Sequence, residues 1–173
     1  MLAVEKVVMR FGGLTALDGA SLSVKPGELK GLIGANGSGK TTLFNVVTGV
    51  YRPRGVAVRF EGRSITGLSP HRVARLGVAR TFQNSTLFPG MTVLNNVLIG
   101  LYGRRGSVSL LNLLSPRAFR QREKRYEEEA SKTLEFVGLS GMAESLVENL
   151  PYGKRHLVQI GRALATSPRL LLM

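Results

Sequence analysis

Apolar and polar residues alternate loosely along the N-terminal stretch that ends at Arg10-Phe11-Gly12-Gly13. This alternation predicts a strand, and the glycine pair predicts the turn that ends it. Leu22 and Val24 predict a second short strand, and Lys25-Pro26-Gly27-Glu28 is typical of the turn that closes such a strand.

The next segment combines an apolar run with glycines. The run Leu29-Lys30-Gly31-Leu32-Ile33-Gly34 predicts a short buried strand. Leu43, Val46 and Val47 follow at helical spacing, and Gly49 stands where a glycine ends a helix. A strand, a glycine loop and a helix in this order are typical of the opening of a nucleotide-binding α/β unit.

Later segments continue this mixture of strands and helices. Residues 56–60 predict a strand, and Ser69-Pro70 and Ser115-Pro116 each predict a helix that begins with Ser as cap and Pro at its first position. The second of these helices ends at Gly138. Its apolar face is formed by Phe119, Tyr126, Ala130, Leu134 and Val137.

The last part of the chain predicts one more helix and one more strand. The helix is expected at about residues 152–166, with Leu157, Ile160 and Leu164 on one side. Residues 169–173 predict a buried strand. The pattern as a whole predicts an α/β fold.

Composition narrows the class of protein. The chain has 173 residues, which suits one domain, and no Cys, which excludes a disulfide framework and a Cys-based zinc site. Its start does not predict a secretory signal, and no apolar run approaches the roughly 18 residues that span a bilayer. We therefore expect a soluble protein, or one held at a membrane by partners.

The charge of the chain is strongly positive. The formal net charge is +13, and no acidic residue occurs between Gly62 and Arg122. Such a surface could meet nucleic-acid phosphates, acidic lipid headgroups or an acidic partner. A solvated basic face is the preferred interpretation, because charge patterning alone is weak evidence.

The most specific motif is Gly34-Ala35-Asn36-Gly37-Ser38-Gly39-Lys40-Thr41, which matches the phosphate-loop pattern G-x-x-x-x-G-K-S/T in full. The glycines let backbone N–H groups curl around a phosphate, and the following helix adds the partial positive charge of its N-terminus. Lys40 can reach the β- and γ-phosphates, the Thr41 hydroxyl can bind Mg²⁺, and Thr42 can contact the α-phosphate. The motif therefore predicts a site for ATP and Mg²⁺.

Further strings occur around the loop in a fixed order. They are Arg10-Phe11-Gly12-Gly13-Leu14, Arg80-Thr81-Phe82-Gln83, Leu87-Phe88-Pro89-Gly90-Met91-Thr92-Val93, Leu150-Pro151-Tyr152-Gly153 and Ile160-Gly161-Arg162-Ala163-Leu164. Together with the loop, these strings resemble the ATP-binding-cassette (ABC) family along essentially the whole chain. They look most like the ATP-binding subunit of the branched-chain amino acid importer.

The resemblance implies a P-loop NTPase fold of ABC type. In this fold an antiparallel β subdomain and a helical subdomain join a parallel-sheet core. It implies a single domain over residues 1–173, whose C-terminal part is missing. The core with the phosphate loop covers about residues 1–82. The Gln83 loop and the helical subdomain cover about 83–150. The signature helix and the start of another core strand cover about 151–173.

The resemblance also implies roles for individual residues. Phe11 would stack on adenine, and Gln83 would ligate Mg²⁺ or orient the attacking water. Residues 84–91 resemble the part that meets the transmembrane subunit, and the surface up to about Gly100 is expected to dock there. The alternative is that Leu87 and Phe88 cap the local core.

The string Leu150-Pro151-Tyr152-Gly153-Lys154 aligns with the family signature, usually Leu-Ser-Gly-Gly-Gln. In the family this motif opens a helix that faces the γ-phosphate of ATP held by a second subunit. Pro151 has neither a hydroxyl nor an N–H, and Lys154 places a cation where the family has an amide. The serine contact is therefore not carried over, and Gly153 remains as a backbone donor.

Hydrolysis in the family uses an Asp at the end of a hydrophobic strand, a Glu directly after it, and a later His. Asp18 is the only Asp and precedes the phosphate loop, and neither His71 nor His156 occupies the place of that His. We expect from this that the chain is part of a longer protein and does not turn over ATP by itself.

The expected function is the ATPase subunit of an ABC importer for branched-chain or similar amino acids, with urea or short amides left open as cargo. The expected partners are a second ATPase subunit, identical or different, transmembrane permease subunits and, indirectly, a substrate-binding protein. The expected location is the cytoplasmic face of the plasma (inner) membrane.

Two alternatives belong to other classes. An ABC-type ATPase acting on DNA is disfavoured, and a nucleic-acid partner is not expected. Lys40 and Gly153 are only 113 positions apart, and no heptad pattern for an inserted coiled coil lies between them. The other alternative is a nucleotide-binding fragment without hydrolysis.

Overall fold

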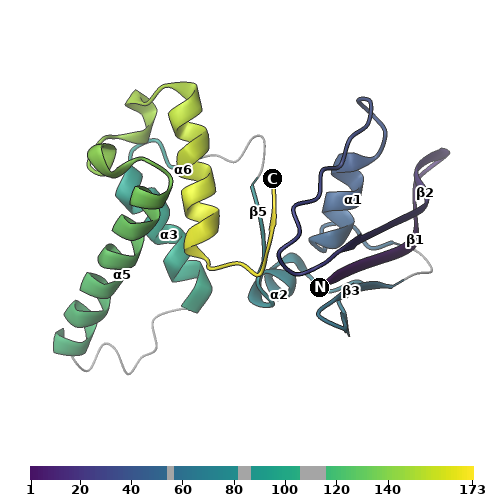
Figure 1. Ribbon diagram of the computed structural model, residues 1–173, viewed down its shortest axis with the longest axis horizontal. Helices are drawn as coiled ribbons and strands as arrows, with labels where there is room; N and C mark the ends of the chain where they lie inside the picture. The colour runs from purple at the N-terminus through teal and green to yellow at the C-terminus, as the bar shows by residue number, and fades with distance from the viewer. Residues whose placement is uncertain (54–56, 82–86, 106–115) are drawn as a thin grey trace. The chain divides into compact units, whose positions relative to one another are not determined.

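A computed structural model describes residues 1–53, 57–81, 87–105 and 116–173 of the chain (Figure 1). The chain divides into two compact units, Met1–Leu76 and Gly77–Met173. Each unit has its own sheet and its own helices, and each is described by itself below.

The first unit is built on an antiparallel hairpin. Strand β1 (Leu2–Phe11) pairs with β2 (Leu14–Val24) from Leu2 opposite Val24 to Phe11 opposite Leu14. Gly12 lies in the turn with a φ of 56°, a left-handed conformation that glycine adopts without strain. The predicted first strand and its glycine turn are confirmed, and the second strand is longer than predicted.

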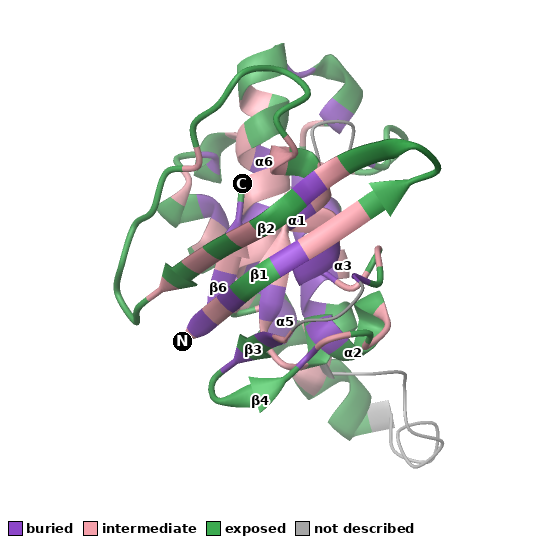
Figure 2. Cartoon of the chain, turned by 90° about the vertical axis from the view of Figure 1, so that its right-hand side faces the viewer, coloured by how far each residue is buried: buried purple, intermediate pink, exposed green. Residues whose placement is uncertain are grey.

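Two short strands complete this sheet. Strand β3 (Val58–Phe60) pairs with the other edge of β1, and β4 (Arg63–Ser64) pairs with β3, so that the order is β2-β1-β3-β4. All three pairings are antiparallel. Figure 2 shows buried positions of β1 interspersed with half-buried and exposed ones, and the exposed hairpin end.

Helix α1 (Lys40–Val47) begins directly after the glycine loop and buries Leu43, Val46 and Val47, as predicted. It ends at Thr48 and Gly49, and Gly49 has a φ of 76°. The buried apolar side chains of this unit are Leu2, Val4, Val7, Leu17, Leu43, Val46, Val47, Val58, Phe60, Ile65 and Val73.

The short helix α2 (Pro70–Arg75) begins as predicted, with Ser69 at the cap and Pro at the first position. The Ser69 side chain, however, does not bond a backbone N–H. Its Oγ instead lies 3.0 Å from Nδ1 of His71.

The predicted strand at residues 29–34 is wrong. No strand is formed there, and the side chains of Leu29 and Ile33 are 93% and 97% exposed. A buried parallel strand needs neighbouring strands that bond its backbone and cover both faces. None of the strands in the described part of the chain pairs with this segment, so Leu29 and Ile33 stay in solvent while Leu32 is half-buried.

The second unit combines a parallel strand pair with helices. Strand β5 (Val78–Arg80) pairs in parallel with β6 (Leu170–Leu172), which confirms the predicted buried strand near the end of the chain. The helices are α3 (Val93–Arg105), α5 (Pro116–Phe136) and α6 (Tyr152–Ala165). Two single turns, η1 (Ser140–Met142) and η2 (Val147–Asn149), lie between α5 and α6.

The three helices share one apolar core. Helix α5 contributes Tyr126, Ala130 and Leu134 from its predicted face, while Phe119 of that face is exposed. Helix α6 buries Val158, Gly161 and Ala165. The predicted stripe of Leu157, Ile160 and Leu164 is only half-buried, because α6 turns its small residues toward α3.

Over the described residues the architecture is a mixed α/β fold with an antiparallel and a parallel sheet, which confirms the predicted fold class. No helix in the described ranges has both the length and the apolar content needed to cross a bilayer.

Candidate functional site

The phosphate-loop motif forms an exposed, tightly curved loop before α1. Gly37 and Gly39 adopt left-handed φ values of 82° and 90°, which side chains with a Cβ rarely tolerate. The N–H of Ser38 donates to the carbonyl of Ala35 at 3.2 Å, and the carbonyl of Gly39 accepts the N–H of Leu43 at 2.8 Å. The loop therefore ends directly in the first turn of the helix.

Two of the glycines also lie close to neighbouring atoms. A Cβ on Gly34 would lie 2.5 Å from Oγ of Ser38. A Cβ on Gly39 would lie 2.6 Å from the carbonyl oxygen of Ala16 and 2.8 Å from Cδ2 of Leu17, both in β2. Strand β2 thus lies against the end of the loop and limits its shape.

The Lys40 ammonium folds back over the loop. Its Nζ donates to the carbonyl oxygens of Gly34 at 2.6 Å and Ala35 at 2.7 Å. The first turn of α1 contains no acidic residue. The partial positive charge of the helix N-terminus and the Lys40 ammonium therefore both attract an anion at the loop. A cation held on a curled backbone at a helix N-terminus fits a phosphate group.

Fewer groups at this loop fit a metal ion than fit a phosphate. Thr41 is exposed on the first turn of α1 and can offer its hydroxyl, while Thr42 beside it is half-buried. Nowhere in the described ranges do three or more His, Cys, Asp or Glu side chains gather to hold a metal. Within the described residues, the Thr41 hydroxyl is the group at this loop that fits Mg²⁺ alongside phosphate oxygens.

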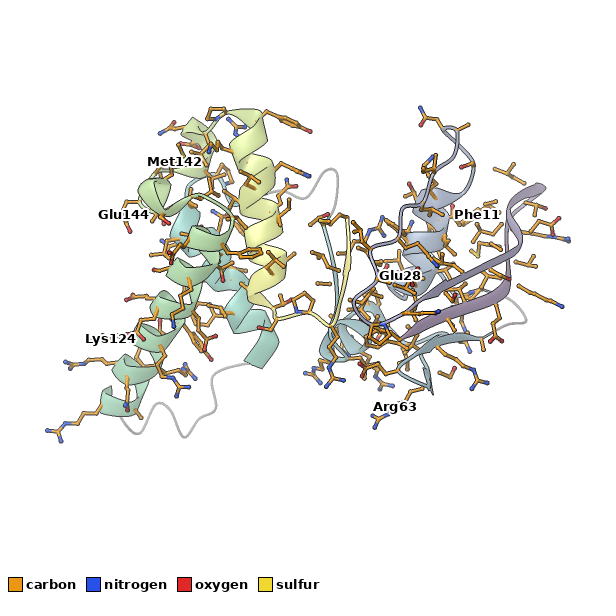
Figure 3. All side chains as sticks on the ribbon, in the orientation of Figure 1. Phe11, Glu28, Arg63, Lys124, Met142 and Glu144 are labelled. Atoms are coloured by element: carbon orange, nitrogen blue, oxygen red, sulfur yellow. The ribbon has the colours of Figure 1, made fainter. Side chains whose placement is uncertain are left out.

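Phe11 occupies the hairpin end of β1 and is 41% exposed (Figure 3). Phe11 pairs with Leu14 of β2. Two residues further along β2 lies Ala16, whose carbonyl is close to Gly39 of the phosphate loop. Two residues of strand span about 7 Å, so Phe11 lies near the phosphate loop. Tyr51, which the sequence did not single out, packs its ring edge to face on Phe11 at 5.1 Å.

Charged groups before the loop form a small local cluster. The Glu28 carboxylate accepts the backbone N–H of Lys25 at 2.6 Å and pairs with the Lys30 ammonium at 2.9 Å. These contacts, the backbone bond first, lower the pKa of Glu28. Lys25 and Glu28 also close the predicted turn through a backbone hydrogen bond of 3.2 Å, and Gly27 within it has a φ of 72°.

The signature segment lies at the N-terminus of α6. Pro151 is the cap residue and forms no side-chain capping bond, Tyr152 is 84% exposed, and Gly153 is exposed. The first N–H groups of a helix have no partner within it, so they are available to an anion. Arg155 braces the segment, because its guanidinium donates to the carbonyls of Leu150 at 2.8 Å and Glu148 at 2.6 Å.

Gln83 and the segment 84–86 lie outside the described residues. The described part of the proposed docking segment begins at Leu87, which is buried in the helical core. Phe88 and Met91 are exposed, at 47% and 41%. The core-capping alternative therefore holds for Leu87 and not for Phe88.

A buried amide fixes the loop that carries these side chains. Asn96 on α3 is fully buried and accepts the N–H of Phe88 at 2.9 Å. Its Nδ2 donates to the carbonyls of Phe88 at 3.2 Å and Thr92 at 3.0 Å. The loop is thus fixed from inside while Phe88 and Met91 face solvent.

The chain is similar to known proteins along its whole length. The sequence model described as "ABC transporter" matches residues 17–173. The high-affinity branched-chain amino acid transport ATP-binding protein BraF of Pseudomonas aeruginosa is 40% identical over the whole chain, which covers 68% of that protein. The corresponding protein LivG of Escherichia coli is 37% identical with the same coverage.

Solved structures agree with these relatives. A nucleotide-free ATP-binding cassette from an ABC transporter matches with a TM-score of 0.81 and 40% identity, over 98% of this chain and 66% of that one. The ADP conformation of such a cassette matches with a TM-score of 0.81 and 38% identity, with the same coverage. The chain spans about two thirds of the length of the proteins it matches.

Proposed function

Since the chain belongs to the ABC transporter family, as an ATP-binding cassette, we propose that it is the ATP-binding subunit of an importer for branched-chain or similar amino acids. The observation that carries the proposal is the phosphate loop, with Lys40 held over a curled backbone at the start of α1. The cargo is proposed because relatives 37–40% identical are named as branched-chain amino acid transport ATP-binding proteins.

In the proposed complex, ATP takes the place of the loop carbonyls as the partner of Lys40. The ammonium leaves Gly34 and Ala35 and meets the β- and γ-phosphates, while loop N–H groups and the α1 N-terminus hold the remaining oxygens. Thr41 would hold Mg²⁺ together with Gln83. The metal would supply neutralising charge between the phosphates.

A second ATPase subunit, identical or different, completes the proposed site. Its signature helix would present backbone N–H groups to the γ-phosphate, and Gly153 is the donor offered by this chain in return. Pro151 offers no hydroxyl. Binding at this end therefore depends on backbone groups, which the Arg155 brace keeps in place.

The proposed partner in the membrane is a permease subunit at the cytoplasmic face, with a substrate-binding protein engaged indirectly. Exposed Phe88 and Met91 support this surface, because two large apolar side chains lie on a loop that Asn96 fixes from within. The loop follows Gln83 directly in the chain, so a change at the γ-phosphate has a short covalent path to the permease.

The first test is nucleotide binding. Lys40→Ala should weaken MgATP binding at least tenfold by calorimetry, because a charge-assisted bond to phosphate is worth about 1.5–3 kcal/mol. Lys124→Ala, which removes an exposed lysine from α5, is the matched control and should leave ATP affinity unchanged. Equal ATP affinity in wild type and Lys40→Ala would refute the proposed site.

The second test concerns the permease. Phe88→Ala should change the free energy of unfolding by less than about 1 kcal/mol, since the side chain is half exposed, yet abolish co-purification with the permease in the transporter complex. Leu87→Ala is the contrasting variant and should destabilise by about 2–5 kcal/mol as a buried truncation. A Phe88→Ala variant that still recovers its permease would exclude the docking role.

A further inference from the structure

Phe11 and Tyr51 form an aromatic pair at the edge of the nucleotide site. The ring centroids are 5.1 Å apart and the ring planes meet at 70°, which is the edge-to-face geometry that aromatic pairs prefer. Phe11 remains 41% exposed in this arrangement. Ring surface on Phe11 is therefore open to a planar ligand while Tyr51 supports it.

Tyr51 is held firmly to the end of α1. The N–H groups of Val50 and Tyr51 both donate to the carbonyl of Asn45, at 2.8 and 3.1 Å. The Thr48 hydroxyl donates to the carbonyl of Phe44 at 2.8 Å. A Cβ on Gly49 would lie 2.3 Å from the carbonyl oxygen of Leu68, so this turn is also closely packed. The Tyr51 backbone is thus fixed relative to the helix that begins at Lys40.

Phe11 has less support of its own. It is the last residue of β1, at the open end of a hairpin whose turn residues Gly12 and Gly13 are exposed. An exposed side chain at a hairpin end samples several rotamers unless a neighbour restricts it. Tyr51 is such a neighbour, and it is anchored to the helix that also carries the phosphate-binding lysine.

We propose that Tyr51 is a positioning residue for the purine: it orients Phe11 for stacking and sets the base site relative to the phosphate site through α1. The proposal rests on the proposed ATP-binding function and adds a residue to it. Tyr51 does not touch phosphate in this scheme, so it affects only the part of ATP affinity that comes from the base.

The experiment compares two ligands by calorimetry, MgATP and magnesium tripolyphosphate, which has the phosphates but no base. The variants are Phe11→Ala, Tyr51→Leu, Tyr51→Phe and the double variant Phe11→Ala/Tyr51→Leu. Phe136→Leu is the matched control, since it removes an exposed aromatic ring at the end of α5.

Tyr51→Leu should weaken MgATP binding by about threefold to tenfold and leave tripolyphosphate binding within about twofold of wild type. Tyr51→Phe should retain wild-type ATP affinity, because the ring without its hydroxyl keeps the aromatic contact with Phe11. The double variant should bind ATP no more weakly than Phe11→Ala, because Tyr51 acts through Phe11. Phe136→Leu should match wild type for both ligands.

Three results would overturn the inference, each in a recognisable way. If Phe11→Ala weakens ATP binding and Tyr51→Leu does not, Tyr51 has no part in the base site. If Tyr51→Leu weakens both ligands equally, Tyr51 supports the loop or the fold and not the base. If the wild-type chain binds neither ligand, the proposed function itself fails, and the inference falls with it.

Discussion

Gly34 and Gly39 are both too crowded for a Cβ, but the obstacles differ in kind. At Gly39 the obstacle is a backbone carbonyl, that of Ala16, and the backbone there is left-handed. At Gly34 the obstacle is the Ser38 hydroxyl, the end of a short side chain that can rotate. The two positions should therefore respond differently to the same substitution.

Gly39→Ala should lower the free energy of unfolding by at least about 1–2 kcal/mol from the left-handed conformation alone, and should abolish ATP binding by distorting the loop. Gly34→Ala should destabilise less and should retain measurable ATP binding, because Ser38 can turn away. Chemical denaturation and calorimetry on the two variants check this order. Gly141→Ala, at an open position with no positive φ, is the control and should behave as wild type.

The motif predicted a curled glycine loop, and the left-handed backbone of Gly37 and Gly39 agrees with that prediction, because these residue types at these spacings set the local conformation. The binding role of Lys40 stays a prediction. The sequence did not single out Tyr51 or Asn96, because neither residue belongs to a recognisable motif. The partners of Tyr51 and Asn96 become visible only once the chain is folded.

At the scale of elements, α3 and α6 pack through glycine. A Cβ on Gly100 would lie 2.3 Å from the carbonyl oxygen of Arg162 and 3.2 Å from Cβ of Ala165. Gly161 on α6 lies against Val97 on α3. A Cβ added to Gly161 would be 3.4 Å from Cγ2 of Val97. The two helices thus approach more closely than larger side chains would permit.

Helix α3 offers a matched pair of glycines for testing this contact. Gly100→Ala should destabilise by about 1–3 kcal/mol, because the new methyl group meets backbone that cannot turn aside. Gly103→Ala, on the same helix with open space around it, should stabilise by up to about 1 kcal/mol through helix propensity. Thermal unfolding of both variants checks the prediction, and shifts of the same sign would contradict it.

Elements with local signals were predicted correctly. The first strand with its glycine turn, the Pro-initiated α2 and the helix ends at Gly49 and Gly138 depend on turn and cap chemistry that the sequence shows directly. The strand expected at residues 29–34 failed, because a strand depends on partners elsewhere in the chain. The α6 face was misplaced because small residues, which carry little hydrophobic signal, form its closest contact.

At the scale of the whole molecule, the dominant property is the formal net charge of +13. Such a charge attracts any polyanion at low ionic strength and is screened by salt. Attraction of this kind does not by itself indicate a function on DNA, because it carries no sequence preference and no link to nucleotide binding.

The chain should bind duplex DNA weakly at about 50 mM salt, without sequence preference, and lose most of this binding by about 200 mM. MgATP affinity should be the same with and without DNA. Fluorescence anisotropy with two unrelated duplexes, followed by ATP titrations in their presence, tests both statements. Mutual strengthening of ATP and DNA binding would instead support an ATPase that acts on DNA, because coupling between two ligands is reciprocal.

The contact between β2 and the phosphate loop decides what must be transferred with the motif if it is to keep its shape in another protein. Residues 34–41 match the sequence pattern in full. The backbone of Gly39, however, packs against Ala16 and Leu17, which belong to a strand well before the motif. A peptide or grafted segment with only the loop and α1 would keep the sequence pattern and lose the contact with Ala16 and Leu17. A designer who moves this phosphate loop to another scaffold must therefore transplant the hairpin with it.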